Sequence, residues 1–283
     1  MTKVSVGMPV FNGEVFIGSA IQSLLDQDHK DLEILISDNA STDATISIIE
    51  SFSDPRITVI KQKSNVGALE NFRLLSALST ANFFLWRSYD DRSDSNYISV
   101  LLDILLCNEG CSLAVSKIVR KRMDGSIAGE IDYPAALNTR SAFFVKDQLS
   151  KSHPGWFYGL YRRANLPDRI QDVVTRYTHV WAWDHLVLFN YVVRGEVMGT
   201  NETKFYQLET GKSDSRWRPK DFRGQYDMAV SFMKYCVSIV KNATLSRGQK
   251  IIIYAYLPSY VNGTTAKFRR IIRSWLKEKL ASS

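Results

Sequence analysis

Short apolar runs alternate with amphipathic stretches along the first hundred residues of the chain. Runs rich in β-branched residues predict strands at residues 4–10, 32–37, 56–61 and 82–86. Apolar residues at helical spacing between these runs predict helices at residues 17–25, 44–52 and 68–79. Strands that alternate with helices of this length predict βαβ units, and therefore an α/β fold with a mostly parallel sheet flanked by helices.

The rest of the chain divides into a mixed middle region and a helical end. A helix is predicted at residues 96–107, a strand at 112–119 and a hairpin-like turn at 121–129. Residues 136–165 are rich in aromatic and small polar residues, and their pattern assigns neither a helix nor a strand. Helices are predicted at residues 180–193, 221–241, 247–256 and from 265 onward, with a polar loop at 209–220. We therefore predict an α/β domain at residues 1–215 and a helical C-terminal extension at residues 216–283.

Three of the predicted strands end in polar or acidic residues. Asn12 follows the first strand, Asp38 follows the second, and the pair Asp90 and Asp91 follows the fourth. Acidic residues just past the ends of parallel strands lie in the ligand crevice of an open α/β sheet. Adjacent carboxylates there suit a hard divalent cation that is bound to phosphate oxygens. The pattern therefore predicts an enzymatic site for a phosphate-containing ligand.

The composition is that of an ordinary globular protein, with 45% hydrophobic and 23% charged residues in a chain of 283. This length suits one large α/β domain with an appendage, or two modest domains. The three cysteines, Cys107, Cys111 and Cys236, are too few and too scattered for a disulfide framework, and no further Cys/His pair completes a zinc site. We therefore expect free thiols in a reducing compartment.

Charge and hydropathy bear on the partners of the chain. No apolar stretch approaches the roughly 18 to 20 residues that span a bilayer, and residues 1–3 lead straight into the first apolar run. We expect a cytoplasmic protein, free or peripheral on the cytosolic face of the inner membrane. The net charge of +7 arises largely after residue 212, which fits an anionic membrane or anionic substrates. No nucleic-acid-binding motif accompanies the basic residues, so no nucleic-acid partner is expected.

Four segments match a known enzyme family in order and spacing. They are residues 6–12, 36–45, 65–67 and 89–91. Together they resemble the family 2 inverting glycosyltransferases, which have the Rossmann-like GT-A fold. The resemblance covers about the first 100 residues. It implies transfer of one sugar from a nucleoside diphosphate donor to a glycan acceptor, with Mg²⁺ or Mn²⁺ as cofactor.

The resemblance also implies the roles of residues at the strand ends. Asn65 and the loop residues Pro9, Phe11 and Asn12 would hold the nucleotide, with Phe11 stacked on the base. Asp38 would accept hydrogen bonds from the base or the ribose, because a carboxylate is an acceptor only. The alternative for Asp38 is an ordinary loop or capping carboxylate.

The acidic pair has separate implied roles. Asp91 would bind the metal, which would act as a Lewis acid on the departing diphosphate, and Asp90 would contact the ribose or the donor sugar. The alternative is a solvated turn, since Asp-Asp is unremarkable on a surface. One or two carboxylates are enough for Mg²⁺ when phosphate oxygens and waters complete its shell.

The acceptor side is implied by a later segment. Asp184, in Trp183-Asp184-His185, matches the position of the family's catalytic base, which takes the proton of the acceptor hydroxyl. An N-cap aspartate is the alternative, and the two roles are compatible. Trp156, Trp183 and His185 are the predicted acceptor-cleft residues, with core packing as the alternative for the tryptophans and a structural role for His185.

The tail at residues 267–280 has a basic amphipathic pattern. One helical face carries Phe268, Ile271, Ile272, Trp275, Leu276 and Leu280, and the other carries Lys267, Arg269, Arg270, Arg273 and Lys277. Such a helix with a tryptophan fits an anionic membrane surface, and docking on the protein's own core is the alternative. A membrane-surface tail agrees with a lipid-linked polysaccharide acceptor.

A second function stays open at this point. Residues 206–209 fall where the family often carries an Arg and a His near the diphosphate, and this chain has neither. Lys212, Arg216 or Arg218 would then supply the positive charge. The departure motivates the alternative of a non-catalytic nucleotide-sugar-binding protein with the same fold.

Overall fold

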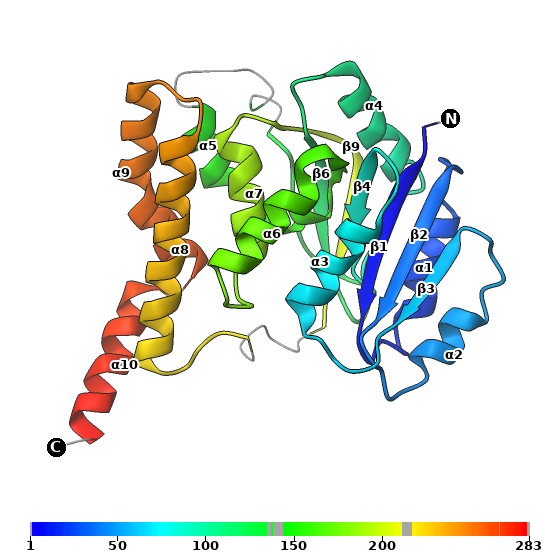
Figure 1. Cartoon of the computed structure of the whole chain (residues 1–283), viewed down its shortest axis with the longest axis horizontal. Coiled ribbons are helices and arrows are strands. Elements are labelled where there is room, and N and C mark those ends of the chain that lie inside the picture. The colour runs from blue at the N-terminus through cyan, green and yellow to red at the C-terminus, as the bar shows by residue number, and fades with distance from the viewer. Residues whose placement is uncertain (1, 135–136, 138–143, 211–216, 266, 282–283) are drawn as a thin grey trace. The chain divides into compact units, whose positions relative to one another are not determined.

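The computed structural model describes residues 2–134, 137, 144–210, 217–265 and 267–281 (Figure 1). The chain forms two compact units. Unit 1 comprises Met1–Asn138, Gly155–Gln171 and Val197–Thr210, and unit 2 comprises Thr139–Pro154, Asp172–Glu196 and Gly211–Ser283. Three segments of the chain therefore contribute to each unit. The division into an α/β domain at residues 1–215 and a helical extension at residues 216–283 stays a prediction.

The first half of the sheet in unit 1 is parallel. Its strands are β1 (Val4–Val10), β2 (Leu32–Asp38), β3 (Ile57–Lys61) and β4 (Phe83–Trp86), in the spatial order β3-β2-β1-β4. Val4, Val6 and Met8 of β1 are completely buried, as expected for a strand covered on both faces. The connections contain α1 (Ile17–Leu25), α2 (Thr45–Glu50) and α3 (Ala68–Leu78).

The strand order reverses between β1 and β4. The chain steps from β1 to β2 to β3 in one direction and then returns across β1 to β4. Because such crossovers are right-handed, α1 and α3 must cover opposite faces of the sheet, and Figure 1 shows α3 in front of β1 with α1 behind. The reversal creates a topological switch point, which is where open α/β sheets bind their ligands.

The second half of the sheet is mixed. After β4 the order continues with β8 (Leu160–Arg162), β6 (Leu113–Arg122), β9 (Val197–Glu209) and β5 (Arg92–Ser93), while β7 (Ile127–Ile131) pairs with β6. β4 with β8, β6 with β8, β6 with β7 and β5 with β9 are antiparallel, whereas β6 with β9 is parallel. Helix α4 (Tyr97–Cys107) follows β5. The parallel arrangement that the sequence predicts is thus confined to the first four strands and to the β6–β9 pair.

Just before β8, and between β8 and unit 2, the chain forms two short helical turns and one helix. These are η2 (Pro154–Tyr158), η3 (Arg163–Asn165) and α6 (Leu166–Arg176), of which η2 and α6 cross a boundary between the units and η3 lies in unit 1. Helix α6 begins in unit 1 and ends in unit 2.

Unit 2 is helical in its described residues. It contains α5 (Phe144–Lys151), α7 (Trp183–Val193), α8 (Phe222–Asn242), α9 (Arg247–Thr264) and α10 (Phe268–Ala281). All residues of α7 from Leu186 to its end are buried. Tyr260 of α9 packs on Phe189 and Phe232, with ring centroids 5.6 Å and 5.9 Å apart. The hydroxyl of Tyr235 accepts a hydrogen bond from Asn190 Nδ2 at 2.8 Å, so this buried amide and this hydroxyl satisfy each other.

Side-chain caps mark the starts of α8 and α9. The carboxylate of Asp221 accepts from the backbone N–H of Gly224 at the start of α8. Ser246 and Gln249 form a reciprocal capping box at the start of α9. α9 continues through Pro258 to Thr264, eight residues beyond the predicted end at residue 256, because its buried positions Leu257, Tyr260 and Val261 keep the helical period.

The α/β fold class with a C-terminal helical appendage is confirmed. Strands β8 and β9 and helices α5 and α6 were not predicted. Within the described part of the chain, no helix combines the length and the apolar character needed to cross a bilayer.

Candidate functional site

The loop after β1 is tied to the loop after β2. Pro9 is buried within β1, whereas the side chain of Phe11 is 43% exposed at its end. Asn12 has a φ of 51°, a left-handed conformation that asparagine tolerates. Its backbone N–H donates to Ser41 Oγ at 2.9 Å, and its side-chain Oδ1 accepts from the backbone N–H of Thr42 at 2.9 Å. The two predicted nucleotide loops therefore form one connected rim.

Asp38 ends β2 directly beside this rim. It is 3% exposed, and its Oδ2 accepts a hydrogen bond from the backbone N–H of Ser41 at 3.1 Å. Its other oxygen, Oδ1, is buried and has no partner among the described residues. A buried carboxylate oxygen without a donor is costly, so this atom is suited to accept a hydrogen bond from a ligand.

A pair of asparagines joins the ends of β2 and β3. Asn39 Nδ2 donates to Asn65 Oδ1 at 3.0 Å, and Asn39 Oδ1 accepts from the backbone N–H of Val66 at 2.8 Å. Asn65 Oδ1 also accepts from the backbone N–H of Gly67 at 2.9 Å. Because its oxygen is used in these bonds, Asn65 shapes the loop in this structure. Its predicted contact with the nucleotide stays a prediction.

The acidic tip follows β4 on the other side of the switch point. Asp91 is 3% exposed, and its Oδ1 accepts from the backbone N–H of Leu208 in β9 at 2.8 Å. Asp90 is half-buried and accepts a hydrogen bond from Ser88 Oγ. Of the two carboxylates, Asp90 is therefore the more accessible.

The electrostatics of the pair arise from burial and from the closeness of two like charges. Burial raises the pKa of Asp90 above its ordinary value. Burial, and then the neighbouring charge of Asp90, raise the pKa of Asp91 well above its ordinary value, while the Leu208 N–H and the Arg87 guanidinium oppose this rise. One buried and one half-buried carboxylate that resist ionisation together form a site that a cation would stabilise.

Arg87, between β4 and the acidic tip, was missed by the sequence prediction. Its side chain is completely buried, and its Nη2 donates to Ser93 Oγ at 2.8 Å. The guanidinium carbon lies 5.4 Å from the ring centroid of Tyr97 and 5.2 Å from that of Phe205. A charged residue directly after an apolar strand was the available signal, because arginine is rarely fully buried without a specific role.

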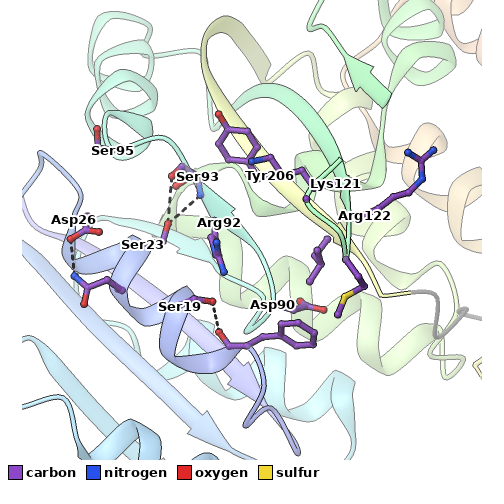
Figure 2. A pocket seen from close by; sticks show the side chains of 15 residues that line it. Ser19, Ser23, Asp26, Asp90, Arg92, Ser93, Ser95, Lys121, Arg122 and Tyr206 are labelled. Atoms are coloured by element: carbon purple, nitrogen blue, oxygen red, sulfur yellow. Dashed lines mark hydrogen bonds between the residues drawn. The ribbon is translucent and has the colours of Figure 1, made fainter. Parts of the chain in front are cut away.

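A cavity of about 770 Å³ adjoins the acidic tip. Its walls come from α1, β5, the turn between β6 and β7, and the end of β9 (Figure 2). Figure 2 shows Asp90 at one end of this cavity and Asp26 of α1 at the other. Of the predicted site residues, Asp90 lines it.

Asp184 lies in the first turn of α7 in unit 2. Its Oδ1 accepts from the backbone N–H of His185 at 2.9 Å. The N-cap position belongs to Ala182, which has a φ of 65°, so the N-cap alternative for Asp184 is wrong. Burial raises the pKa of Tyr177 and of Tyr260, and the charge of Asp184 adds to both rises.

The predicted acceptor-cleft residues differ in exposure. The indole of Trp156, in unit 1, is 1% exposed and packs on Tyr133 with ring centroids 5.3 Å apart. This burial favours core packing, the alternative considered for Trp156. In unit 2, Trp183 is 7% exposed, and His185 is half-buried with a buried Nδ1 that has no partner among the described residues.

Of the three basic residues predicted near the diphosphate, the structure describes Arg218. The guanidinium carbon of Arg218 lies 3.9 Å from the ring centroid of Trp181, within unit 2. Lys212 and Arg216 lie outside the described residues. In β9, Glu209 pairs with Arg120 Nη1 at 3.1 Å.

Comparison with known proteins decides the family. Residues 5–167, more than half of the chain, match the model of the family described as Glycosyl transferase family 2. The chain belongs to this family. Figure 1 shows the family 2 segment as the blue-to-green part of the chain, which includes β2, β3 and β4.

Curated relatives are similar over part of their length. The GalNAc(5)-diNAcBac-PP-undecaprenol beta-1,3-glucosyltransferase of Campylobacter jejuni is 28% identical over 172 residues, which is 60% of this chain and 54% of that protein. The putative glycosyltransferase EpsE of Bacillus subtilis is 31% identical over 94 residues, 32% of this chain and 34% of that protein. The chain thus spans about half the length of the first relative and about a third of the second.

Solved structures share the fold. TarS of S. aureus in complex with UDP-GlcNAc has a TM-score of 0.71 at 17% identity, over 93% of this chain and 74% of that chain. The mannosyltransferase PcManGT from Pyrobaculum calidifontis, in complex with GDP-Man and Mn²⁺, has a TM-score of 0.57 at 14% identity, over 99% and 76%. These identities establish a common fold and nothing further.

The donor atoms of this family 2 chain fit a hard divalent cation. No group of three or more His, Cys, Asp or Glu side chains that would hold a metal occurs among the described residues. Asp90 and Asp91 supply carboxylate oxygens, the ligands that Mg²⁺ and Mn²⁺ prefer. Because Mg²⁺ usually retains waters and binds through one or two carboxylates plus substrate phosphates, this small set is sufficient.

Proposed function

We propose that the chain is an inverting glycosyltransferase that moves a sugar from a nucleoside diphosphate donor to a hydroxyl of a glycan acceptor. The observation that carries the proposal is the gathering of Asp38, Asp90 and Asp91 on both sides of the β1–β4 switch point in a family 2 chain. The complexes of TarS with UDP-GlcNAc and of PcManGT with GDP-Man and Mn²⁺ support a nucleotide-sugar donor.

The proposed donor site lies at the carboxyl ends of β1, β2 and β3. Phe11, at the exposed end of β1, offers its ring to the base. Asp38 offers its unpartnered Oδ1 to an N–H of the base or a hydroxyl of the ribose. Asn12 and Asn65 make hydrogen bonds that shape the rim beside these two groups, and Pro9 lies buried within β1.

The acidic pair would hold Mg²⁺ or Mn²⁺ together with the diphosphate. The bound cation supplies charge neutralisation as the bond between the sugar and the diphosphate breaks. The sequence resemblance gives the metal to Asp91 and the ribose or donor sugar to Asp90. The greater exposure of Asp90 leads us to include its carboxylate among the metal ligands.

Asp184 is the proposed catalytic base. Its carboxylate would take the proton of the acceptor hydroxyl as that oxygen attacks the anomeric carbon from the face opposite the diphosphate. One C–O bond forms and one breaks in a single displacement, so the configuration inverts and the nucleoside diphosphate leaves. Trp183 and His185, beside Asp184 in α7, are proposed to contact the acceptor.

A lipid-linked glycan is the proposed acceptor, and the cytosolic membrane face the proposed location. The printed name of the C. jejuni relative specifies an undecaprenol-linked glycan. In α10, Phe268, Ile272, Trp275 and Leu276 are between 43% and 57% exposed, although Ile271 is only 8% exposed. Lys267, Arg269, Arg270 and Arg273 are exposed around them, a pattern that suits an anionic membrane surface. The side chains of Lys277 and Leu280 lie outside the described residues.

The test is a screen of nucleotide-sugars with glycan acceptors, with and without Mn²⁺ or Mg²⁺. We expect divalent-dependent release of nucleoside diphosphate and a product whose anomeric configuration, read by NMR, is opposite to that of the donor. Asp184→Asn should bind donor normally in a thermal-shift assay but lose turnover by roughly 10²-fold or more. Asp103→Asn, on the exposed side of α4, is the matched control.

The non-catalytic alternative makes a different prediction. The lack of an Arg and a His at residues 206–209 favours it. Donor binding by calorimetry without turnover against any acceptor would establish it. Retention of full transfer by Asp90→Asn, Asp91→Asn and Asp184→Asn would show that the site is misassigned.

A further inference from the structure

The cavity beside α1 is separate from the proposed nucleotide rim. Of the described residues that line it, Asp90 belongs to the proposed site, and Phe11, Asn12, Asp38 and Asn65 are not among them. From Asp90 the groove continues along α1, past Ser19 and Ser23, to Asp26 (Figure 2). A ligand in this groove would therefore begin next to the acidic tip and extend away from the nucleotide.

The lining combines apolar surface with hydrogen-bonding groups. Phe16, Met123 and Leu208 supply apolar and aromatic surface, and Gln22, Ser23 and Asp26 supply amide, hydroxyl and carboxylate groups. A sugar ring has an apolar face of C–H groups and an edge of hydroxyls, so it needs both kinds of partner at once. The volume of about 770 Å³ lies within the usual range for small-molecule sites.

The charges of the groove are of both signs, which gives no preference for a strongly anionic ligand. Arg92, Lys121 and Arg122 line it together with the carboxylates of Asp26 and Asp90. The Lys121 ammonium lies 4.2 Å from the ring centroid of Tyr206, and Arg122 Nη1 donates to Ser126 Oγ at 3.2 Å. With both signs present and two of the cations engaged locally, the groove lacks the single-sign field that attracts a polyanion.

We propose that this groove binds an uncharged oligosaccharide, namely sugars of the glycan acceptor that lie away from the reacting hydroxyl. This assignment rests on the proposed function, because it places the non-reacting part of the acceptor in unit 1. Binding of remote sugars would raise the affinity for a long acceptor without changing the chemical step. The groove would thus select acceptors by length.

The first test measures binding without donor and without turnover. The methyl group of Met123, 57% exposed in the groove, is observed by NMR in protein labelled at methionine methyls, with maltohexaose and chitohexaose as probes. The resonance is assigned with Met123→Leu. We expect at least one hexasaccharide at millimolar concentration to shift this resonance, while the buried Met8 methyl stays in place. Inorganic diphosphate should leave Met123 unshifted.

Variants locate the binding. Gln22→Trp, on the exposed side of α1, should fill the groove and abolish the shift, whereas Leu106→Trp, on the exposed side of α4, should preserve it. If Gln22→Trp does not fold, Asp26→Ala should weaken hexasaccharide binding about tenfold, as expected for one lost charged hydrogen bond. No shift with either hexasaccharide, or an equal shift with diphosphate, would overturn the proposal.

The second test separates this inference from the proposed function. If transfer occurs, Gln22→Trp should raise KM for a long acceptor about tenfold and leave kcat and donor hydrolysis unchanged. An unchanged KM would overturn the groove assignment while the transferase assignment stands. Hexasaccharide binding without any transfer would instead support the groove and count against the proposed reaction.

Discussion

The Oδ1 atom of Asp91 accepts a hydrogen bond from the backbone N–H of Leu208 at 2.8 Å, across 117 positions of sequence. This bond joins the acidic tip after β4 to the end of β9. It holds the tip in place, but it also keeps a carboxylate in a buried setting beside Asp90. Asp91 therefore carries a cost in stability that a bound cation would offset.

Asp91→Asn should stabilise the metal-free protein at neutral pH and weaken its response to metal. The folded-state pKa of Asp91 is raised above that of the unfolded chain, so its favourable contribution is present below the unfolded value and is lost as pH rises through the folded value. An asparagine keeps an oxygen for the Leu208 N–H and removes the charge. Each kcal/mol gained should raise Tm by roughly 2–4 °C.

Thermal unfolding at pH 5 and pH 8 without divalent cations checks this prediction. The difference in Tm between Asp91→Asn and the wild type should grow with pH. Mn²⁺ with a nucleoside diphosphate should raise the Tm of the wild type more than that of Asp91→Asn. Asp91→Leu is the control, since it leaves the Leu208 N–H buried and should cost about 1–3 kcal/mol. A variant Asp91→Asn that is less stable than the wild type at both pH values would contradict the argument.

Much of unit 1 could be predicted from the sequence because its elements carry strong local signals. The apolar runs of β1, β2 and β4 and the helical spacing of α1 set these elements to within a residue or two. β9 could not be predicted, because Thr200, Asn201 and Glu202 interrupt its apolar pattern, and pairing with β6 and β5 makes it a strand. β8, with three residues, is likewise specified by its neighbours β4 and β6.

The candidate site was predictable in its acidic residues and unpredictable in its backbone. Asp38, Asp90 and Asp91 follow apolar runs, so their place at the sheet edge follows from the pattern. Nothing in an alanine signals a left-handed conformation, yet Ala40 and Ala182 have φ values of 61° and 65°, each two positions from Asp38 or Asp184. Such strained backbone persists where the surroundings enforce it, and it gathers at functional sites.

Asp38→Asn should weaken nucleotide binding. The Ser41 N–H can still donate to the amide oxygen of the asparagine. The N–H₂ group then takes the place of Oδ1, which is buried without a partner, and it donates hydrogen bonds instead of accepting them. Hydrogen bonds to charged groups contribute about 1.5–3 kcal/mol, so the Kd for the preferred nucleoside diphosphate should rise about tenfold or more. Calorimetry measures the change, and Asp103→Asn serves as the control. Equal affinity in Asp38→Asn and the wild type would remove Asp38 from the site.

The three thiols should differ in reactivity. Cys107 is exposed, while Cys111 and Cys236 are buried, and burial raises the pKa of Cys236 well above its ordinary value. Because the thiolate is the nucleophile, a thiol reagent such as DTNB should modify one cysteine quickly in the native protein and all three after unfolding. Cys107→Ser should abolish the fast reaction. Rapid modification of Cys236 in the native state would mean that α8 is less well packed than the structure indicates.

Substitutions in α10 should separate membrane binding from donor chemistry. Trp275→Ser with Leu276→Ser removes exposed apolar surface, and Arg270→Gln with Arg273→Gln removes two exposed charges. Both pairs should reduce sedimentation with phosphatidylglycerol vesicles while donor hydrolysis is kept. If each basic residue near an anionic surface contributes about 1 kcal/mol, loss of the arginine pair should weaken binding roughly thirtyfold.

Ile251→Ser, at a 67% exposed position in α9, is the control and should bind vesicles like the wild type. Equal binding of wild type and both α10 variants, or equal binding to phosphatidylcholine vesicles, would rule out α10 as the membrane contact.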